Sequence, residues 1–256
     1  MPAELRLQRI QQQLEQRGFV RVRDLADEFG VSTVTARADL QTLEERQYAY
    51  RVHGGAMPLS ARGERTFEEV ATERADEKQA VAAAAAMLVS SGETVILDVG
   101  TSAAALATAL VARADLDELT IVTSGLKIAL ALEAAYPRFT VVVSGGTLRP
   151  KQHSLVDPMA TEMLQMLSVD TVFLGCNGVS LEHGVTNLNL PEASVKRAML
   201  SAARRSVVIA DSTKLGARAL APVCPLGDID VLVTDRGADE STIEQFKTAG
   251  VDIVVA

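Results

Sequence analysis

Several residue types are scarce in this chain of 256 residues. It contains no Trp, aromatic residues make up 4%, and the only cysteines are Cys176 and Cys224. Two distant cysteines cannot supply a four-ligand zinc site or a disulfide framework, so we expect both to be reduced and buried. The shortage of aromatic rings argues against surfaces that bind bases or sugars by stacking. Small aliphatic side chains must fill the core.

Long apolar runs are also missing. No stretch approaches the roughly 20 apolar residues of a membrane span, and residues 1–10 lack the apolar centre of a signal peptide. We therefore expect a cytoplasmic protein. Because 48% of the residues are apolar, a chain of this length can bury about 70–75% of its unfolded surface. Disorder over the whole length is excluded.

Common catalytic and cofactor motifs are absent as well. The first predicted strand is not followed by G-x-G-x-x-G, and G-x-x-x-x-G-K-[ST] does not occur, so dinucleotide and nucleoside-triphosphate sites are unsupported. His53, His153 and His183 lie too far apart in sequence for a local metal motif. No Ser-His-Asp arrangement can be assembled. We expect no metal, no cofactor and no catalytic residue.

The net charge of −8 is unevenly distributed along the chain. Residues 1–60 hold eight arginines and eight acidic residues, so the rest of the chain carries the entire negative excess. The acidic total would argue against binding to nucleic acid. The neutral first segment and the acidic remainder instead indicate two parts with different partners.

The first part has the pattern of three short helices. Apolar residues at helical spacing predict a helix over residues 5–16. An extended segment over 19–22 follows, after which Asp24 can cap a second helix and Gly30 can end it in the left-handed conformation. Two helices and their connection are thus predicted before residue 31.

A third helix is predicted over residues 33–46, where Ser32 can cap the first amides and Val34, Leu40 and Leu43 form the buried face. The connection from the second helix has the spacing of a helix-turn-helix, whose second helix enters the major groove of DNA. The alternative is an ordinary three-helix unit with solvated arginines, or a module that binds a partner other than DNA.

Residues 48–56 alternate like a strand and then break at Gly54 and Gly55, which predicts a hairpin wing. Arg51 and His53 could then reach the DNA backbone or minor groove, although an exposed hairpin histidine is often merely solvated. The DNA-binding candidates are Ser32, Thr33, Thr35, Arg37, Arg51, His53 and Gly54.

The composition changes after the wing. Turn-forming and polar residues without an apolar period predict a linker over 58–72, between a first domain over 1–57 and a second over 73–256. A long helix with an alanine run is predicted over 73–89, and its smooth face is suited to contact with a second subunit.

Seven apolar runs bounded by turns then alternate with helical patterns. They cover residues 94–98, 119–123, 139–144, 171–174, 206–210, 231–234 and 251–255. Continuous Val/Ile/Leu strands separated by helices predict an α/β domain with a mainly parallel sheet covered on both faces. Such sheets bind ligands beyond the carboxyl ends of their strands.

Polar and glycine residues gather after five of these strands. Residues 100–102 open a helix over 103–112, so their amides and hydroxyls could hold a phosphate, with Lys214 as a cation for the same anion. Glu192 and Lys196 lie four apart on a helix and could form an ion pair or point into the site. Each feature alone is equally typical of a turn or a solvated helix face. The ligand candidates are Asp98, Gly100, Thr101, Ser102, Ser124, Gly145, Gly146, Asn177, Glu192, Lys196, Asp211 and Lys214.

The segment LADEFGVSTVTARADLQTLEE followed by RVHGGA resembles the N-terminal domain of the DeoR family of bacterial transcriptional regulators. The segments LDVGTS, SGGTLR, FLGCNG, GVTNLNLPEASVKRAM and IADSTKLG resemble the sensor domain of that family. The resemblance implies a winged helix-turn-helix that binds operator DNA. It also implies a C-terminal domain whose fold is similar to that of ribose-5-phosphate isomerase. This domain would bind a phosphorylated sugar or related metabolite and assemble the subunits, and we expect dimers or tetramers.

The sequence departs from the family pattern at several positions. Ala36 replaces an isoleucine that is common in the family, and Ala38 replaces a second arginine. Gln47 lies where a glycine is usual, and Ser124 lies where asparagine is frequent. The resemblance still implies a regulator, more often a repressor of sugar-metabolism genes.

One further departure bears on catalysis. Asn177 occupies a position where an acid is frequent, and an amide cannot move a proton between sugar carbons, whereas Glu192 could. We therefore expect a protein that is not an enzyme. The alternative is a sugar-phosphate isomerase-like enzyme with an appended helical domain.

Overall fold

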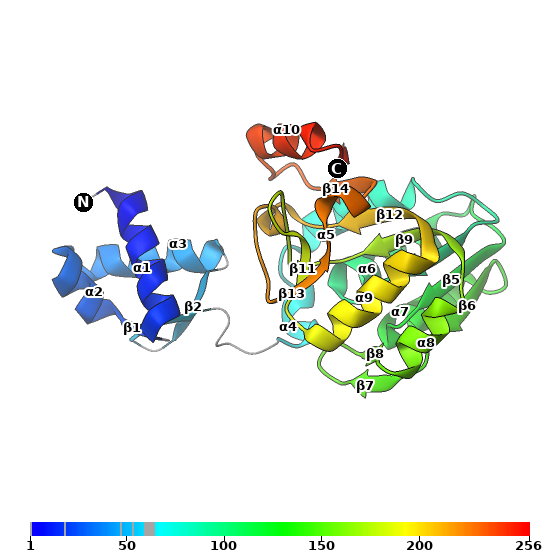
Figure 1. Ribbon diagram of the computed structural model, residues 1–256, viewed down its shortest axis with the longest axis horizontal. Coiled ribbons are helices and arrows are strands. Elements are labelled where there is room, and N and C mark those ends of the chain that lie inside the picture. The colour runs from blue at the N-terminus through cyan, green and yellow to red at the C-terminus, as the bar shows by residue number, and fades with distance from the viewer. Residues whose placement is uncertain (1, 18, 47, 53, 59–64) are drawn as a thin grey trace. The chain divides into compact units, whose positions relative to one another are not determined.

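The computed structural model describes residues 2–17, 19–46, 48–52, 54–58 and 65–256, and the chain divides into two compact units (Figure 1). The N-terminal unit covers Met1–Arg65 and the C-terminal unit covers Thr66–Ala256. A short helix, α4 (Phe67–Ala71), lies in the range that the sequence predicts as a linker. The domain bounds 1–57 and 73–256 stay predictions.

The N-terminal unit contains three helices and a small antiparallel sheet. The helices are α1 (Ala3–Arg17), α2 (Val22–Phe29) and α3 (Thr33–Glu45). The predicted hairpin is present as β2 (Ala49–Val52) and β3 (Gly55–Pro58), and β3 also pairs with β1 (Val20–Arg21). Gly30 ends α2 with φ 63°, as predicted. The winged helix-turn-helix architecture is confirmed.

Two details of this unit differ from the prediction. Helix α2 begins at Val22 rather than after Asp24. Asp24 lies in the first turn, where its negative charge interacts favourably with the positive end of the helix dipole. Val34 is not buried but 71% exposed. The buried stripe of α3 runs through Ala36, Leu40 and Leu43. Val34 lies about 200° around the helix from Ala36, at 3.6 residues per turn.

The C-terminal unit is built on a seven-stranded sheet in which every neighbouring pair is parallel, with the order β15-β14-β12-β9-β4-β5-β6. Each strand corresponds to one of the seven predicted runs. The strands are β4 (Thr94–Leu97), β5 (Leu119–Thr123), β6 (Phe139–Val143), β9 (Val169–Leu174), β12 (Ala203–Ile209), β14 (Val231–Thr234) and β15 (Asp252–Val255).

Alternate residues of these strands pack into different layers, because side chains of a strand point to opposite faces in turn. Val95 and Leu97 join a cluster with helices α5 (Ala75–Ala86), α6 (Thr101–Ala112) and α7 (Leu126–Leu132). Ile96 joins the cluster on the other face. Both faces of the sheet are covered, which confirms the predicted α/β class.

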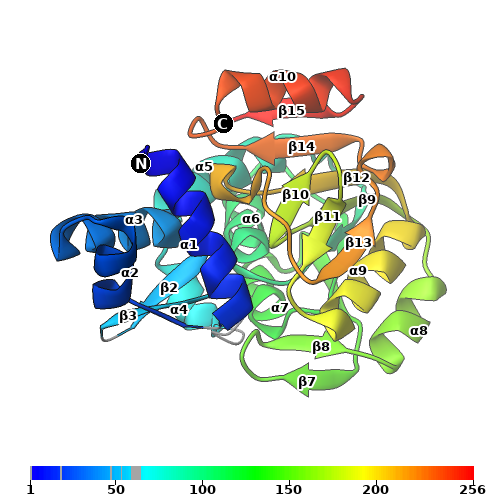
Figure 2. The same cartoon turned by 60° about the vertical axis from the view of Figure 1, so that its left-hand side comes forward.

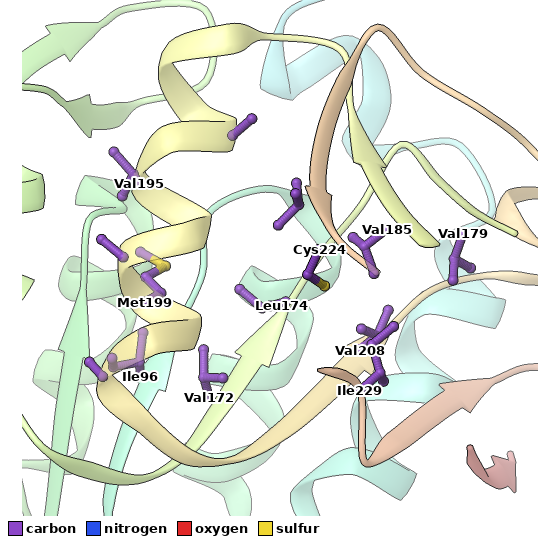
Figure 3. Close-up of a cluster of buried hydrophobic side chains, with 14 of the residues drawn as sticks. Ile96, Val172, Leu174, Val179, Val185, Val195, Met199, Val208, Cys224 and Ile229 are labelled. Carbon is purple, nitrogen blue, oxygen red and sulfur yellow. The ribbon is translucent and has the colours of Figure 1, made fainter. Parts of the chain in front are cut away.

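The second face is covered by α8 (Met159–Gln165), α9 (Leu190–Ala202) and α10 (Glu240–Thr248), and α9 crosses in front of the sheet in Figure 1. Figure 3 shows part of this cluster, in which Val195 and Met199 of α9 pack with Val172 and Leu174 of β9.

Several short elements were not predicted. They are the hairpin β7 (Thr147–Arg149) and β8 (Ser154–Val156), and the antiparallel sheet of β10 (Gly178–Ser180), β11 (Gly184–Asn187) and β13 (Ala221–Cys224). These strands mix apolar residues with Gly, Ser, Thr, Asn, Pro or Arg, so no continuous apolar run marks them. The predicted long helix begins only at Ala75, because Arg74 takes a left-handed conformation with φ 50°.

The strand order defines where a ligand can bind. From β4 the chain proceeds outward to β5 and β6, then returns to β9 on the other side of β4 and proceeds through β12, β14 and β15. The order therefore reverses between β4 and β9. Loops that leave the carboxyl ends of two such strands turn to opposite sides and leave a crevice between them.

Candidate functional site

A buried ion pair lies at this reversal point. Asp98, the residue after β4, is 1% exposed, and its Oδ2 accepts a hydrogen bond of 2.9 Å from the amide of Gly175 after β9. The same carboxylate pairs with Lys196 of α9, whose Nζ also donates to the Gly175 carbonyl oxygen at 3.0 Å. Burial raises the pKa of Asp98, and the Lys196 ammonium acts in the opposite direction. Lys196 thus pairs with Asp98 and not with Glu192.

Glu192 has its own partner, Arg149 of β7, and both side chains are largely buried. Its Oε1 accepts a hydrogen bond of 2.9 Å from Ser154 Oγ of β8, and its Oε2 lies 3.4 Å from Asn187 Nδ2. The proposed Glu192–Lys196 ion pair is therefore wrong. The alternative, that both side chains point into the ligand site, stays a prediction.

Arg149 and Ser154 are absent from the predicted set. Arg149 stands 43 residues before Glu192, and no local spacing links the two. The only available signal was an arginine within the glycine-rich SGGTLR segment after a strand.

Cys176 lies among four of the predicted residues. The charges of Lys214, Lys196, Asp211 and Asp98 all influence the pKa of its thiol. Burial dominates and raises the pKa of the Cys176 thiol to about 12, although the two lysines lower it. Both cysteines are free, as expected, but Cys176 is partly exposed whereas Cys224 is buried.

The start of α6 has an open N-terminus. Its N-cap residue is Gly100, with φ 98°, so no side chain caps the first amides. Thr101 and Ser102 lie half-buried in the first turn. The helix begins at Thr101 and not at 103. Amides at a helix N-terminus attract anions. At the end of the neighbouring strand β5, Ser124 is fully buried and accepts a hydrogen bond of 3.0 Å from Ser144 Oγ.

Other predicted residues have structural roles. Gly145 and Gly146 have φ of 71° and 118°, and a Cβ on Gly146 would lie 2.3 Å from the Val156 carbonyl oxygen, so the turn into the hairpin requires glycine. Asn177 is exposed, and its Oδ1 accepts a hydrogen bond of 2.8 Å from the Leu188 amide. It holds the loop before α9.

Asp211 faces Arg74 at the start of α5. The Arg74 Nε lies 3.6 Å from Asp211 Oδ1, and its Nη2 lies 3.7 Å from Asp235 Oδ1. Lys214 closes the short 3₁₀ helix Ser212–Lys214 and is half-buried. Asp211 therefore pairs with an arginine that the sequence analysis did not select.

In the N-terminal unit, the predicted DNA-binding residues gather at the start of α3. The Ser32 Oγ caps the helix by accepting a hydrogen bond of 3.0 Å from the Thr35 amide, as predicted. Thr33, Val34 and Arg37 are exposed beside it. This surface presents two hydroxyls, a methyl-bearing side chain and a cation.

The wing is held close to α3. The backbone amide of Arg51 donates to Glu44 Oε1 at 2.9 Å, while the Arg51 side chain is exposed. Gly54 forms the turn with φ 83°. At Gly55 a Cβ would lie 2.0 Å from a carbonyl oxygen of β1, which explains the second glycine. His53 lies outside the described residues.

Within the described ranges, no helix has the length and apolarity needed to cross a membrane. The same part of the chain contains no cluster of three or more His, Cys, Asp or Glu side chains that would suit a metal ion.

A three-helix unit with a wing, joined to an α/β unit with buried charged residues at the strand ends, is the architecture of a DNA-binding regulator with a sensor domain. The DeoR-like helix-turn-helix domain matches residues 6–61, and the DeoR C terminal sensor domain matches residues 73–236. The chain belongs to the DeoR family of transcriptional regulators. We call its two parts the winged unit (Met1–Arg65) and the sensor unit (Thr66–Ala256).

Similar curated proteins extend over almost the whole chain. The HTH-type transcriptional regulator GlpR of Haloferax volcanii is 34% identical over 99% of this chain and 98% of its own length. The putative aga operon transcriptional repressor of Escherichia coli O157:H7 is 34% identical over 98% and 93%. The glycerol-3-phosphate regulon repressor of Escherichia coli K12 is 27% identical over 90% of both chains.

Solved structures with partial similarity include ribose 5-phosphate isomerase A from Methanocaldococcus jannaschii. It is 18% identical, covers 56% of this chain and 55% of its own, and has a TM-score of 0.41. A similarity of this extent supports no conclusion about activity.

Proposed function

We propose that this regulator represses genes of sugar or carbohydrate metabolism and that a phosphorylated sugar or related metabolite controls its affinity for operator DNA. The observation that carries the proposal is the buried polar cluster of Asp98, Glu192 and Lys196 at the reversal point of the sheet. Buried charges are costly unless they are paired or functional. Two relatives are named as repressors, one of them of a glycerol-3-phosphate regulon, which supports a phosphorylated effector.

In this proposal the effector phosphate binds the amides and hydroxyls of Thr101 and Ser102, with Lys214 as a countercharge. The carboxylates of Asp98 and Glu192 accept hydrogen bonds from the sugar hydroxyls. Each carboxylate also has a cationic partner, Arg149 for Glu192 and Lys196 for Asp98, so the buried charge is paired. The site then selects ligands that combine a phosphate with neighbouring hydroxyls.

On the DNA side, the start of α3 enters the major groove, where Thr33, Thr35 and Arg37 contact phosphates or base edges. Arg51 of the wing contacts the backbone or the minor groove. A single winged unit binds a specific site weakly, so we propose a homodimer or homotetramer whose winged units bind two half-sites together. Such a regulator acts in the cytoplasm, where a bacterial genome lies.

The proposal is tested by mobility shifts of the full chain on DNA from upstream of its own gene and its neighbours, over a salt series. Glycerol 3-phosphate, ribose 5-phosphate, fructose 6-phosphate and glucose 6-phosphate are added one at a time. We expect salt-dependent specific binding that one of these compounds weakens or strengthens, since an effector must bind the two conformations with different affinities. Indifference of a bound operator to all four would contradict the sensing half.

We also propose that the sensor unit binds its ligand without converting it. The exposed amide of Asn177 cannot transfer a proton, and the Glu192 carboxylate is held by Arg149 and Ser154. Purified protein should therefore not isomerise ribose 5-phosphate. Turnover that disappears in Glu192→Gln would favour the isomerase-like alternative instead.

A further inference from the structure

The β7–β8 hairpin contacts the candidate effector site with its inner side. Arg149 and Ser154 both bind the Glu192 carboxylate, and the Arg149 Nη1 lies 3.4 Å from Ser154 Oγ. Ser154 is fully buried and the Arg149 side chain is 13% exposed. A change at Glu192 therefore acts on both strands of the hairpin at once.

The turn of the same hairpin contacts α4. The Phe67 amide donates a hydrogen bond of 2.7 Å to the Lys151 carbonyl oxygen. The His153 Nε2 lies 2.9 Å from Glu68 Oε1, and the His153 ring meets the Phe67 ring edge-on with centroids 6.0 Å apart. The hairpin and α4 are close neighbours in the sensor unit, as Figure 2 also shows.

A lysine of α7 strengthens this contact. Lys127 Nζ pairs with Glu68 and lies 4.6 Å from the centroid of the Phe67 ring. The amide of Leu126 donates to the His153 carbonyl oxygen at 2.9 Å, so the turn and the start of α7 are joined. Lys127 and then His153 lower the pKa of Glu68 to about 2, so this carboxylate is ionised in neutral buffer.

Besides these contacts, helix α4 packs against α6 and is hydrogen-bonded to α5. It contains five residues, none of them buried, and an isolated helix of this length is unstable in water. A capping box between Thr66 and Glu69 closes its first turn. Lys78 of α5 donates to the carbonyl oxygens of Val70 and Glu73, both at 2.7 Å. The N-terminal turn of α4 is joined to the hairpin through the Phe67 amide and the Glu68 side chain.

We propose that the β7–β8 hairpin links the effector site to α4 and that Glu68 and Phe67 are positioning residues for the response of the DNA-binding state to the effector. The inference rests on the proposed function. Helix α4 is the first element of the sensor unit, directly after the segment that leads from the winged unit. An effector that competes for Glu192 or Arg149 changes the hairpin, and the hairpin changes the contacts of α4.

The first test measures the link without any effector. In Glu192→Gln the ion pair with Arg149 is lost, and we expect faster hydrogen exchange of the α4 amides, with unchanged exchange in α10 on the same protein. If α10 also exchanges faster, the Glu192→Gln protein has lost stability as a whole. The measurement is then repeated with Arg149→Lys, which keeps the positive charge. Unchanged exchange of α4 in a folded variant overturns the inference.

The second test measures transmission. In the full chain with Glu68→Gln or Phe67→Leu, binding of the responding phosphosugar, measured by calorimetry, and operator affinity without it should stay within about twofold. The change of operator affinity caused by that phosphosugar, about 5- to 150-fold for typical coupling, should fall below about threefold. Glu162→Gln removes an equally exposed carboxylate on α8 and should retain the full response. A full response in both α4 variants overturns the inference.

The two proposals fail in different ways. If the unchanged protein binds its operator but responds to none of the phosphosugars, the proposed effector class is wrong, and the exchange measurement alone decides whether the hairpin and α4 are linked. If the unchanged protein responds and the α4 variants respond equally, the effector class stands and the hairpin link is rejected.

Discussion

The two units place their cations in opposite environments. In the winged unit, Arg37 and Arg51 are exposed beside the start of α3 and on the wing. In the sensor unit, Lys196 is buried and Arg149 is largely buried, and each is paired with a carboxylate. An exposed cation attracts a polyanion over about a Debye length, roughly 8–10 Å, and is weakened by salt. A buried pair has little reach, but it distinguishes small polar ligands by geometry.

Burial, and not the unit itself, decides the role. The winged unit also contains a buried pair, in which Arg6 Nε donates to Asp39 Oδ2 at 2.6 Å and Arg6 Nη2 donates to Asp39 Oδ1 at 2.9 Å. This pair joins α1 to α3 and leaves the DNA-facing side to exposed residues. Paired buried charges thus fix the architecture, while exposed charges remain available to a partner.

The largest loss of stability is expected when one partner of a buried ion pair is removed. Lys196→Met leaves the Asp98 carboxylate uncompensated, and we expect the free energy of unfolding of the sensor unit to fall by about 3–5 kcal/mol. Lys247→Met removes an exposed lysine with an exposed carboxylate partner and should change stability by less than about 0.5 kcal/mol. Urea unfolding at pH 7 measures both.

The loss of stability in Lys196→Met should depend on pH. Burial already raises the pKa of Asp98, and removal of Lys196 raises it further. A carboxyl whose pKa is higher in the folded state binds protons more tightly there, so folding is favoured as the pH falls toward that pKa. The deficit of Lys196→Met should therefore shrink between pH 7 and pH 4. An equal deficit at both values would contradict a buried uncompensated carboxylate.

The exposed cations are tested next. Arg37→Ala should weaken operator binding by about 1–3 kcal/mol if the side chain contacts a base, with relaxed specificity at that position. If it contacts a phosphate, all sequences should weaken alike and the salt slope should decrease by about 0.9. Mobility shifts over a salt series separate the two. Arg204→Ala, on an exposed arginine of the sensor unit, is the control and should have no effect.

A smaller effect is expected at the cap of α3. Ser32→Ala removes the hydrogen bond to the Thr35 amide and should lower the stability of the winged unit by about 1 kcal/mol. Thermal unfolding measures the change. Ser32→Asp supplies another capping side chain and should retain stability, while its negative charge weakens DNA binding. Equal stability of the alanine variant would show that the cap is not needed.

The smallest effect should come from Val34. Because this side chain is 71% exposed, Val34→Ala should change the free energy of unfolding by less than about 0.5 kcal/mol. Leu40→Ala, in the buried stripe of the same helix, should cost about 2–5 kcal/mol. A clear loss of stability in Val34→Ala would mean that Val34 is buried in solution, in contradiction to the structure.

The strands of the main sheet were predicted because continuous apolar runs bounded by turns can be recognised in the sequence. β5 and β14 match the predicted ranges residue for residue, since both are continuous runs of buried residues bounded by turns. Helix α3 and its cap were also readable, because Ser32 and the glycine before it are local signals. Strands such as β7 and β8, which mix polar and apolar residues and pair with each other in a short hairpin, carry no such signal.

The candidate site was predictable in its location but not in its pairing. Polar residues after strands point to the carboxyl edge of a parallel sheet, and Asp98 lies there. Spacing alone suggested that Glu192 and Lys196 pair with each other. The partners actually chosen, Arg149 and Asp98, lie on other elements, and only the three-dimensional packing brings them within reach. The role of Asn177 was hidden for the same reason.

The reversal of strand order between β4 and β9 has a consequence for synthesis on the ribosome. The winged unit is complete within the first 65 residues, whereas the crevice needs β9 and α9, which extends to Ala202. Domains generally fold as units, the N-terminal one first. A nascent chain thus has a folded DNA-binding part well before it can sense anything. Translation speed over the intervening residues sets how long the winged unit exists without a complete sensor unit.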